Sequence, residues 1–304
     1  MEWQQLTTEP NALGESPFWH PMEQKLYWLD IVGKAICRTD LHTKVVEKWA
    51  MPSEPGCIAP MQGGGLVMAL RHGIYKAQQW GSCLEHVATL PYNTATVRAN
   101  DGKCDAQGRF WVGTVDETKQ QQSAGLFCID STKGDAEIRC LISNATTANG
   151  LAWSPDHQTM YWADTPTHTV HAWSYDNQNA NLSNQHTFAQ FKPKPQGWLS
   201  GQTGYQGRPD GATVDVQGNY YVAMYEGGQV AKYAADGSML AQYPTPMLCP
   251  TMPCFGGHDL RTLFVTSARH GRSLNELKAH PLSGCVIYTQ MDVPGLPVQF
   301  FKPA

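Results

Sequence analysis

Short apolar runs separated by turn-forming residues recur along the chain and match one another when they are aligned. ESPFWHPMEQKLYWLD (15–30) and NGLAWSPDHQTMYWAD (149–164) align without a gap, each as a short strand, a turn and a longer strand. The pattern predicts a sixfold repeat of strand pairs. The other four units are NDGKCDAQGRFWVGT (100–114), DGATVDVQGNYYVAM (210–224), CIAPMQGGGLVMAL (57–70) and TMPCFGGHDLRTLFVTS (251–267).

Each unit continues into a third strand, such as KAICRTD or TVHAWSYD, and most continue into a fourth, such as KVVEKWA or HTFAQF. A period of roughly 40 to 50 residues with four strands per unit is typical of a propeller. We therefore predict an all-β fold, a six-bladed β-propeller of four-stranded antiparallel blades around a central channel, as a single domain over 1–304. Either WQQLT (3–7) or PVQFFK (297–302) is expected to close the ring as a terminal strand.

Charge and composition narrow the classes of partner. The chain has 22 Lys and Arg residues against 26 Asp and Glu, a formal net charge of −4, and no basic cluster, so we expect no nucleic-acid partner. No stretch reaches the roughly 20 apolar residues that cross a bilayer, and MEWQQLTTEP lacks a signal pattern. A soluble cytoplasmic protein without a membrane partner is expected, with its nine irregularly spaced cysteines reduced.

Four oxygen-bearing side chains stand at the same phase of the repeat: Glu15, Asn100, Asn149 and Asp210. The first strand of a propeller blade lies nearest the channel, so equivalent residues at its leading end converge. Glu15, Asn149 and Asp210 would present two carboxylates and an amide carbonyl, which are ligands for a hard cation. We predict that they bind one divalent cation, with Ca²⁺ as the first expectation and Mg²⁺, Mn²⁺, Zn²⁺ and Fe²⁺ as alternatives.

Hairpin turns are the competing interpretation of these positions, because Asn-Gly and Asp-Gly are strong turn signals. It applies to Asn149-Gly150, Asp210-Gly211 and Asp101-Gly102. Each unit nevertheless has its own turn five to seven residues later, at SPDHQ, DVQG or DAQG. A second tight turn would leave almost no strand, so the pattern favours the cation site.

Arg98 and Asn100 form a second group of candidate residues. Arg98 precedes Asn100 by two residues and lies on the same side of an extended segment. A guanidinium and an amide can hold hydroxyl and carbonyl oxygens of a polar substrate. The alternative is a structural arginine that pairs with a carboxylate of a neighbouring blade. Asp101 is expected to hold backbone or to support the metal ligands.

The segment FKPKPQGWLSGQTGYQGR (191–208) is the longest departure from the repeat, and it directly precedes Asp210. It is too long for an ordinary connection between blades and is rich in Gly, Pro and Gln. A lid over one mouth of the ring and a mobile surface excursion both remain possible interpretations.

Five segments occur in an order that resembles the senescence marker protein/gluconolactonase/luciferin-regenerating (regucalcin-like) family. The resemblance spans residues 13–288, and the carboxyl segment 273–301 is more similar to the bacterial sugar-lactonase branch than to the animal protein. The five segments are LGESPFWHP, RANDGKCDAQGRFWVGT, NGLAWSPDHQTMYWADT, RPDGATVDVQGNYYVA and PCFGGHDLRTLFVTSAR.

The resemblance implies a six-bladed propeller that hydrolyses a sugar lactone with the help of one divalent cation. It places the cation on Glu15, Asn149 and Asp210, and the substrate on Arg98 and Asn100. A further acidic substrate contact falls on Asp116 or Glu117, and which of them carries it stays open.

In the hydrolysis that the resemblance implies, Asp210 is our candidate general base, because a carboxylate near the attacking water can take its proton. No Ser nucleophile is needed, and the sequence has no Gly-x-Ser-x-Gly elbow.

Three other functions remain open. They are a metal-dependent arylesterase or phosphotriesterase-like propeller, a calcium-binding regucalcin-like protein without turnover, and a repeat scaffold for protein partners. The scaffold leaves the phased set of Glu15, Asn149 and Asp210 unexplained. The identity of the sugar, the physiological metal and the oligomeric state do not follow from the sequence.

Overall fold

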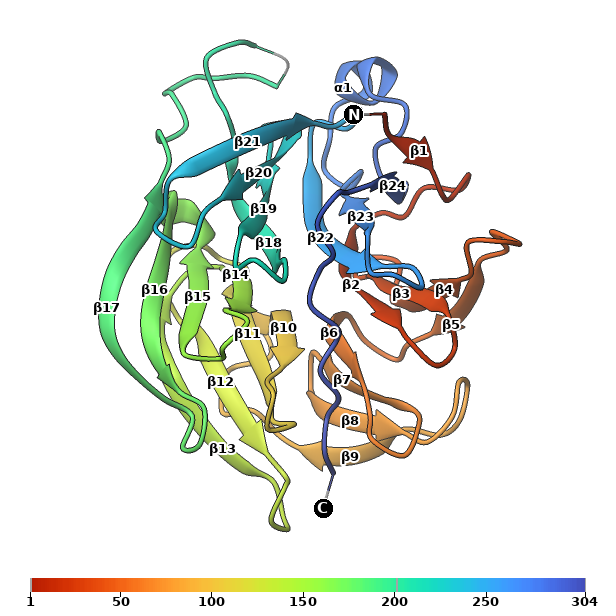
Figure 1. The fold of residues 1–304 in the computed structure, drawn as a ribbon, viewed down its shortest axis with the longest axis vertical. Coiled ribbons are helices and arrows are strands. Elements are labelled where there is room, and N and C mark those ends of the chain that lie inside the picture. Colours follow the sequence, from red (N-terminus) through yellow and green to blue (C-terminus); the bar gives the residue numbers. More distant parts are fainter. Residues whose placement is uncertain (1, 201, 304) are drawn as a thin grey trace.

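Six four-stranded antiparallel sheets surround a central channel in the computed structural model, which describes residues 2–200 and 202–303 (Figure 1). The predicted six-bladed β-propeller is therefore confirmed. The first three blades are β2 (Gly14–His20), β3 (Lys25–Asp30), β4 (Ala35–Thr39) and β5 (Glu47–Ala50); β6 (Pro55–Pro60), β7 (Leu66–Leu70), β8 (Gly73–Ala77) and β9 (Glu85–Ala88); and β10 (Val97–Cys104), β11 (Phe110–Asp116), β12 (Ala124–Asp130) and β13 (Glu137–Ala145). The fourth and fifth are β14 (Ala148–Trp153), β15 (Thr159–Asp164), β16 (Thr169–Asp176) and β17 (Asn181–Gln190); and β18 (Arg208–Val214), β19 (Tyr220–Tyr225), β20 (Gln229–Tyr233) and β21 (Met239–Pro244).

The sixth blade closes the ring with strands from both ends of the chain. Its members are β22 (Pro250–Gly256), β23 (Thr262–Ser267), β24 (Ile287–Gln290) and the amino-terminal β1 (Gln4–Gln5). β1 pairs antiparallel with β24, Gln4 opposite Tyr288 and Gln5 opposite Ile287. Of the two segments expected to close the ring, the one near the start of the chain does so.

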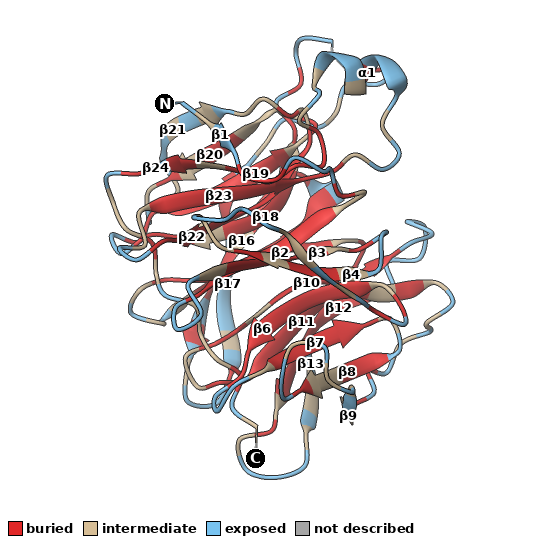
Figure 2. Cartoon of the chain, turned by 90° about the vertical axis from the view of Figure 1, so that its right-hand side faces the viewer, coloured by how far each residue is buried: buried red, intermediate tan, exposed pale blue. Residues whose placement is uncertain are grey.

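Burial changes from the centre of each blade to its rim. Every residue of the inner strand β2 is buried, whereas β21 at the rim is exposed or half-buried throughout. Apolar side chains of adjacent blades share a core cluster, which includes Val67 of β7 and Phe110 and Val112 of β11. Figure 2 shows the same gradient, with buried inner strands and exposed outer loops. Inner strands covered on both sides form the core that fixes their positions.

Equivalent turns in two units are held by the same bonds. The Oδ1 of Asp105 accepts from the backbone N–H of Gln107 and Arg109, at 2.9 and 3.1 Å. The Oδ1 of Asp215 accepts from Gln217 and Asn219 in the same way, both at 2.9 Å. An aspartate that caps its own turn explains why DAQG and DVQG recur.

The carboxyl-terminal segment 292–303 forms a strap that crosses the channel (Figure 1). The amide of Leu296 donates to the carbonyl of Val214 in blade five, and the amide of Phe301 donates to Pro60 in blade two, at 3.2 and 2.8 Å. Gly295 is required at the crossing, since a Cβ there would lie 2.1 Å from the Cβ of Phe255. PVQFFK therefore covers the ring without adding a strand to a blade, apart from a single bridge between Met61 and Phe301.

Helix is scarce in the described ranges and consists of η1 (Thr165–Thr167) and α1 (Leu274–Ala279). The sequence analysis did not predict α1. The hydroxyl of Ser273 caps it by accepting from the amide of Glu276 at 3.2 Å, and this Ser-x-x-Glu spacing is the signal that could have identified it. Within 2–200 and 202–303, no helix is both long enough and apolar enough to cross a bilayer.

Candidate active site at one mouth of the channel

The candidate residues lie inside inner strands and not in hairpin turns. Asn149 belongs to β14, Asp210 to β18, and Asn100 with Asp101 to β10. Each of these strands has a register shift at this point, a bulge in the pairing with the next strand of the blade. The hairpin interpretation of the Asn-Gly and Asp-Gly pairs is therefore wrong, because the glycines serve bulges within strands.

The four residues were predicted to share one position of the repeat, but they occupy two different positions relative to the bulges. Glu15 and Asn149 are the last paired residues before the bulge, opposite Leu29 and Ala163. In β10 and β18 the last paired residues are one position earlier, so that Asn100 and Asp210 lie within the bulge. The two sets thus differ by one ladder position. The bulge changes the direction of the side chains, so they still meet.

In β2 and β14, the residue that follows the candidate residue has a left-handed backbone conformation. Ser16 has φ +47° and Gly150 has φ +68°. Glycine adopts this conformation freely, whereas serine adopts it at a cost that its surroundings must offset. The hydroxyl of Ser16 accepts from the amide of Ile58 in the next blade at 3.1 Å, which holds the strained residue in place.

A chain of hydrogen bonds joins blades three, four and five. The Nη1 of Arg98 donates to the Oδ1 of Asn100 at 3.0 Å, and the Nδ2 of Asn100 donates to the Oδ1 of Asn149 at 3.1 Å. The Nδ2 of Asn149 donates to the hydroxyl of Thr165 at 2.7 Å, which in turn donates to the carbonyl of Pro209 at 2.8 Å. Both amides are thereby oriented, and the carbonyl oxygen of Asn149 keeps a second lone pair for a ligand.

Three carboxylates are buried together at this end of the channel. Glu15 and Asp210 are each 7% exposed, and Asp101 is 4% exposed. Burial raises the pKa of Glu15 well above its ordinary value, and the charges of Asp210 and Asp101 raise it further. Burial and the charge of Asp101 raise the pKa of Asp210 as well. Buried like charges that repel one another favour either protonation or a bound cation.

Asp101 combines a backbone role with an unpaired oxygen. Its Oδ2 accepts from the amide of Leu151 in blade four at 3.0 Å, which confirms the expectation that it holds backbone. Its buried Oδ1 has no partner among the described residues. The ammonium of Lys103 donates to the carbonyl of Ala212, and its charge lowers the pKa of the Asp101 carboxyl against the larger effect of burial.

The donor set fits a hard divalent cation. Two carboxylates and an amide carbonyl, from Glu15, Asp210 and Asn149, provide oxygen only, as Ca²⁺ or Mg²⁺ prefers. No group of three His, Cys, Asp or Glu side chains arranged to hold a metal occurs in the part of the chain that the structure describes. A site that includes an asparagine lies outside that pattern. A cation between the buried carboxylates would relieve their repulsion.

Arg98 pairs with an acidic residue of its own blade. Its Nε lies 3.4 Å from the Oε1 of Glu117, and Arg71 of blade two binds the same carboxylate at 2.8 and 3.0 Å. Asp116 is committed elsewhere, because it accepts from the amides of Thr118 and Gln121, both at 2.9 Å. Of the two acidic residues left open by the sequence, Glu117 is the one beside Arg98.

The segment 191–208 is anchored near the same mouth. The rings of Trp198 and Tyr205 are buried and lie 5.1 Å apart, and the hydroxyl of Tyr205 lies 2.7 Å from the Nε2 of His168 after η1. The hydroxyl of Ser200 donates to Glu276 of α1, and Figures 1 and 2 both show this loop beside α1. The lid interpretation thus has defined contacts.

Arg208 is a residue of this site that the sequence analysis missed. It precedes Asp210 by two residues, as Arg98 precedes Asn100, and this equal spacing is the signal that could have identified it. Its charge lowers the pKa of the Asp210 carboxyl. Opposite Arg208 in the ladder stands Tyr225, whose ring lies 5.0 Å from the guanidinium carbon.

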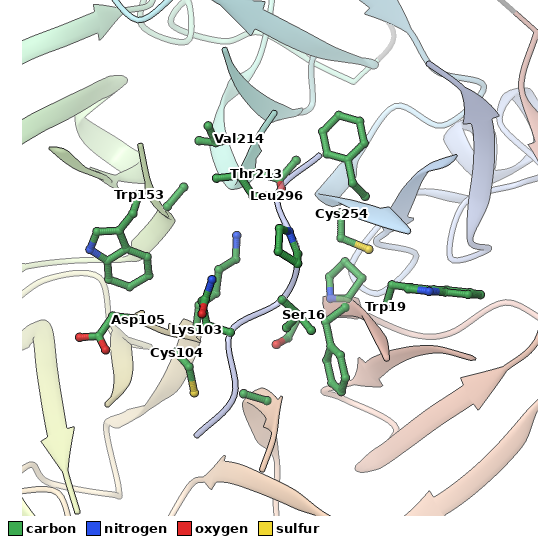
Figure 3. Close-up of a pocket in the computed structure, with 18 of the residues that line it drawn as sticks. Ser16, Trp19, Lys103, Cys104, Asp105, Trp153, Thr213, Val214, Cys254 and Leu296 are labelled. Atoms are coloured by element: carbon green, nitrogen blue, oxygen red, sulfur yellow. The ribbon is translucent and has the colours of Figure 1, made fainter. Parts of the chain in front are cut away.

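A cavity of about 110 Å³ occupies the other end of the channel (Figure 3). The same inner strands line it with residues that follow the candidate residues, among them Lys103, Trp153 and Thr213. Leu296 of the strap also lines it. Glu15, Asn149 and Asp210 are not part of this lining. The channel therefore has a polar mouth and, opposite to it, a largely apolar cavity beneath the strap.

Comparison with known proteins agrees with the fold. Residues 13–269 match the family described as SMP-30/Gluconolactonase/LRE-like region. A 6-deoxy-6-sulfogluconolactonase of Pseudomonas putida is 37% identical over 94% of this chain and 94% of its own, and a regucalcin of Danio rerio is 31% identical over 95% and 94%. A solved structure of a luciferin-regenerating enzyme is 26% identical and covers 99% of both chains, with a TM-score of 0.88.

Proposed function

The chain belongs to the SMP-30/gluconolactonase/LRE-like family, and from this premise we propose that it hydrolyses a sugar lactone to the open-chain aldonic acid with the help of a divalent cation. One observation carries the proposal. Buried carboxylates and amides of blades one, three, four and five meet at one mouth of the channel, beside the paired Arg98 and Glu117. A site in which water attacks a hydroxyl-rich ester needs these groups and no Ser or Cys nucleophile.

Glu15, Asn149 and Asp210 would hold the cation through their side-chain oxygens. When bound, the cation supplies Lewis acidity at the lactone carbonyl and lowers the pKa of water nearby. The amide of Ser16, which donates to the Oε2 of Glu15 at 3.1 Å, and the bond from Asn149 to Thr165 keep both ligands in place. Held ligands lose little freedom when the cation binds.

Asp210 is the proposed general base. Its carboxylate accepts from the backbone N–H of Gly211 and keeps further lone pairs for water. In the reaction, a water oxygen bonds to the carbonyl carbon while Asp210 takes one water proton. The bond between the carbonyl carbon and the ring oxygen then breaks, and the proton passes to that oxygen to give a sugar hydroxyl.

Arg98, Asn100 and Glu117 are the proposed substrate-binding residues. The guanidinium of Arg98 supports the negative charge that develops on the carbonyl oxygen. The Nδ2 of Asn100 already donates to Ala148 and Asn149, so its amide oxygen is the atom that can accept from a sugar hydroxyl. Glu117 is fixed by Arg71 and can accept from a second hydroxyl. Donors and acceptors that are oriented before the substrate arrives discriminate strongly for hydroxylated lactones.

The test is hydrolysis of neutral aldonolactones by chelator-treated protein, with Ca²⁺, Mg²⁺, Mn²⁺, Zn²⁺ or Fe²⁺ added back singly. Glucono-, xylono-, arabino- and galactonolactone form the panel, and proton release is measured. We expect turnover of at least one lactone only after a cation is added, above the spontaneous rate with heat-unfolded protein and the same cation. Cation binding without turnover of any lactone would instead support a calcium-binding protein, and turnover without a cation would contradict the cation site.

A further inference from the structure

A cluster of charged side chains borders the proposed active site on the side of the segment 191–208. Glu226, only 5% exposed, is its centre. The Oε2 of Glu226 lies 3.0 Å from the Nη1 of Arg208 and 2.9 Å from the Nζ of Lys194. Its Oε1 lies 3.1 Å from the Nη1 of Arg272. We call these residues, with Glu276, the cationic cluster.

The cationic cluster carries more positive than negative charge. Three cations, Lys194, Arg208 and Arg272, face two carboxylates, Glu226 and Glu276, the latter 2.7 Å from Arg272. Each cation contacts a carboxylate, but the cluster as a whole keeps one positive charge in excess. Uncompensated charge at a partly desolvated site favours an anionic ligand.

His168 does not change this balance. Its Nδ1 lies 3.1 Å from the carbonyl of Pro166 and its Nε2 lies 2.7 Å from the hydroxyl of Tyr205. An Nδ1–H that donates to the carbonyl leaves Nε2 as the acceptor of the tyrosine proton. Burial lowers the pKa of His168, so its ring is neutral near pH 7.

Arg208 is the member of the cationic cluster nearest to the proposed chemistry. It stands two residues before Asp210 on β18, and its charge lowers the pKa of that carboxyl. The aromatic face of Tyr225 supports the guanidinium, and the side chain of Arg208 keeps 25% of its surface exposed. Arg98 lies in blade three and Arg208 in blade five, so the two guanidiniums flank the proposed cation site from different blades.

We propose that Arg208 and the excess charge of the cationic cluster bind an anionic substituent of the lactone, remote from its carbonyl group. This inference rests on the proposed function, which it narrows to lactones that carry a terminal carboxylate or sulfonate. Both groups have planar or trigonal sets of oxygens that accept paired N–H bonds from a guanidinium. A neutral hydroxyl at the same place would leave the excess positive charge of the cluster without a counter-charge.

The experiment compares kcat/KM for glucarolactone, which bears a terminal carboxylate, with kcat/KM for gluconolactone, which bears a hydroxyl. A gluconolactone with a terminal sulfonate provides the second anionic arm and decides between the two anions. We expect the better anionic lactone to exceed the neutral one by at least about 10-fold, and Arg208→Gln to lower that ratio by roughly 10- to 100-fold. Arg208→Lys should retain part of the ratio, because it keeps the charge but not the planar fork.

Arg261→Gln is the matched control, the same chemical change in the hairpin between β22 and β23, outside the cationic cluster. It should leave the ratio unchanged. If Arg208 only balances the charge of Asp210, Arg208→Gln will change both lactones alike, and the constant ratio would overturn the inference while lactone hydrolysis stands.

Calorimetric binding of glucarate and gluconate decides the inference independently of turnover. These acids differ in one terminal carboxylate, and wild-type protein should bind glucarate at least about 10-fold more tightly, an advantage that Arg208→Gln removes. If no lactone is hydrolysed, the proposed function fails on that result alone. Equal affinity of the wild-type protein for the two acids would overturn the anion site.

Discussion

The two ends of the channel are built by the same inner strands and yet differ in almost every physical respect. At one mouth the strands bulge, and buried Glu15, Asp101 and Asp210 face amides and guanidiniums. A few residues further along, beyond Lys103, the ladders are regular and the lining is largely apolar beneath the strap. One strand thus presents strained, charged groups at its start and packs a core at its end. The packing at the apolar end offsets the free-energy cost of the strained backbone and buried charges at the polar mouth.

Replacement of the proposed base should produce the largest difference between the two ends. Asp210→Asn keeps the size of the side chain but removes its ability to take a proton, so kcat/KM for a neutral aldonolactone should fall by roughly 100- to 10,000-fold. Thr213→Val, three residues along the same strand, alters the lining of the cavity and should leave kcat/KM within about 3-fold. Equal losses in the two variants, measured by initial rates, would remove the functional distinction between the ends.

The strap should determine stability and not turnover. Phe301 is 1% exposed and packs beside Phe110, so Phe301→Ala should lower the free energy of unfolding by about 3–5 kcal/mol. Phe300→Ala, at the half-buried neighbour, should cost clearly less. Denaturant titration measures both changes. The folded fraction of each variant should keep its kcat/KM, and a loss of turnover without a loss of stability would place the strap in the active site.

The smallest expected effect is the contribution of Glu15 to the pH dependence of the free energy of unfolding of the metal-free protein. Because burial raises the folded-state pKa of this carboxyl, the unfolded chain releases its proton first, and stability falls as the pH rises from the unfolded value through the folded one. Glu15→Gln removes that loss. In chelator we expect it to raise the free energy of unfolding by about 2 kcal/mol at pH 8 and by little at pH 4. When the cation is added back, it should stabilise the Glu15→Gln variant less than it stabilises the wild-type protein. A gain at pH 4 that equals the gain at pH 8 would contradict the assignment.

Sequence periodicity predicted the blades because each blade repeats the same strand lengths and the same turn chemistry. Asp105 and Asp215 occur five residues after Asn100 and Asp210, and both cap their turns alike. The one-residue offset at the bulges did not follow, since a bulge depends on pairing with the next strand and a linear alignment absorbs it as a gap. Thus Glu15 and Asn100 looked equivalent along the sequence but occupy different ladder positions.

The surroundings of the candidate site were harder to predict than its centre. Glu117 and Asp116 are neighbours in sequence, and only the contact with Arg71 of another blade separates their roles. Arg208 carried a signal in its spacing to Asp210, and its partner Glu226 stands at the position that Asp116 occupies in blade three. Contacts between blades depend on how the ring closes, and such long-range pairing leaves no local pattern.

The pairing of β1 with β24 affects how the chain can be made. A ribosome releases β1 before the first five blades and β24 after them, so β1 must wait for its partner while those five blades are translated. Until then the ring is an open arc, and β24 when it emerges presents an unpaired edge to any neighbouring nascent chain. Pairing of β1 with β24 of the same molecule competes with pairing between the strands of two molecules. Because β1 has only two residues, it forms few hydrogen bonds with the sheet of another molecule, and this limits the exchange.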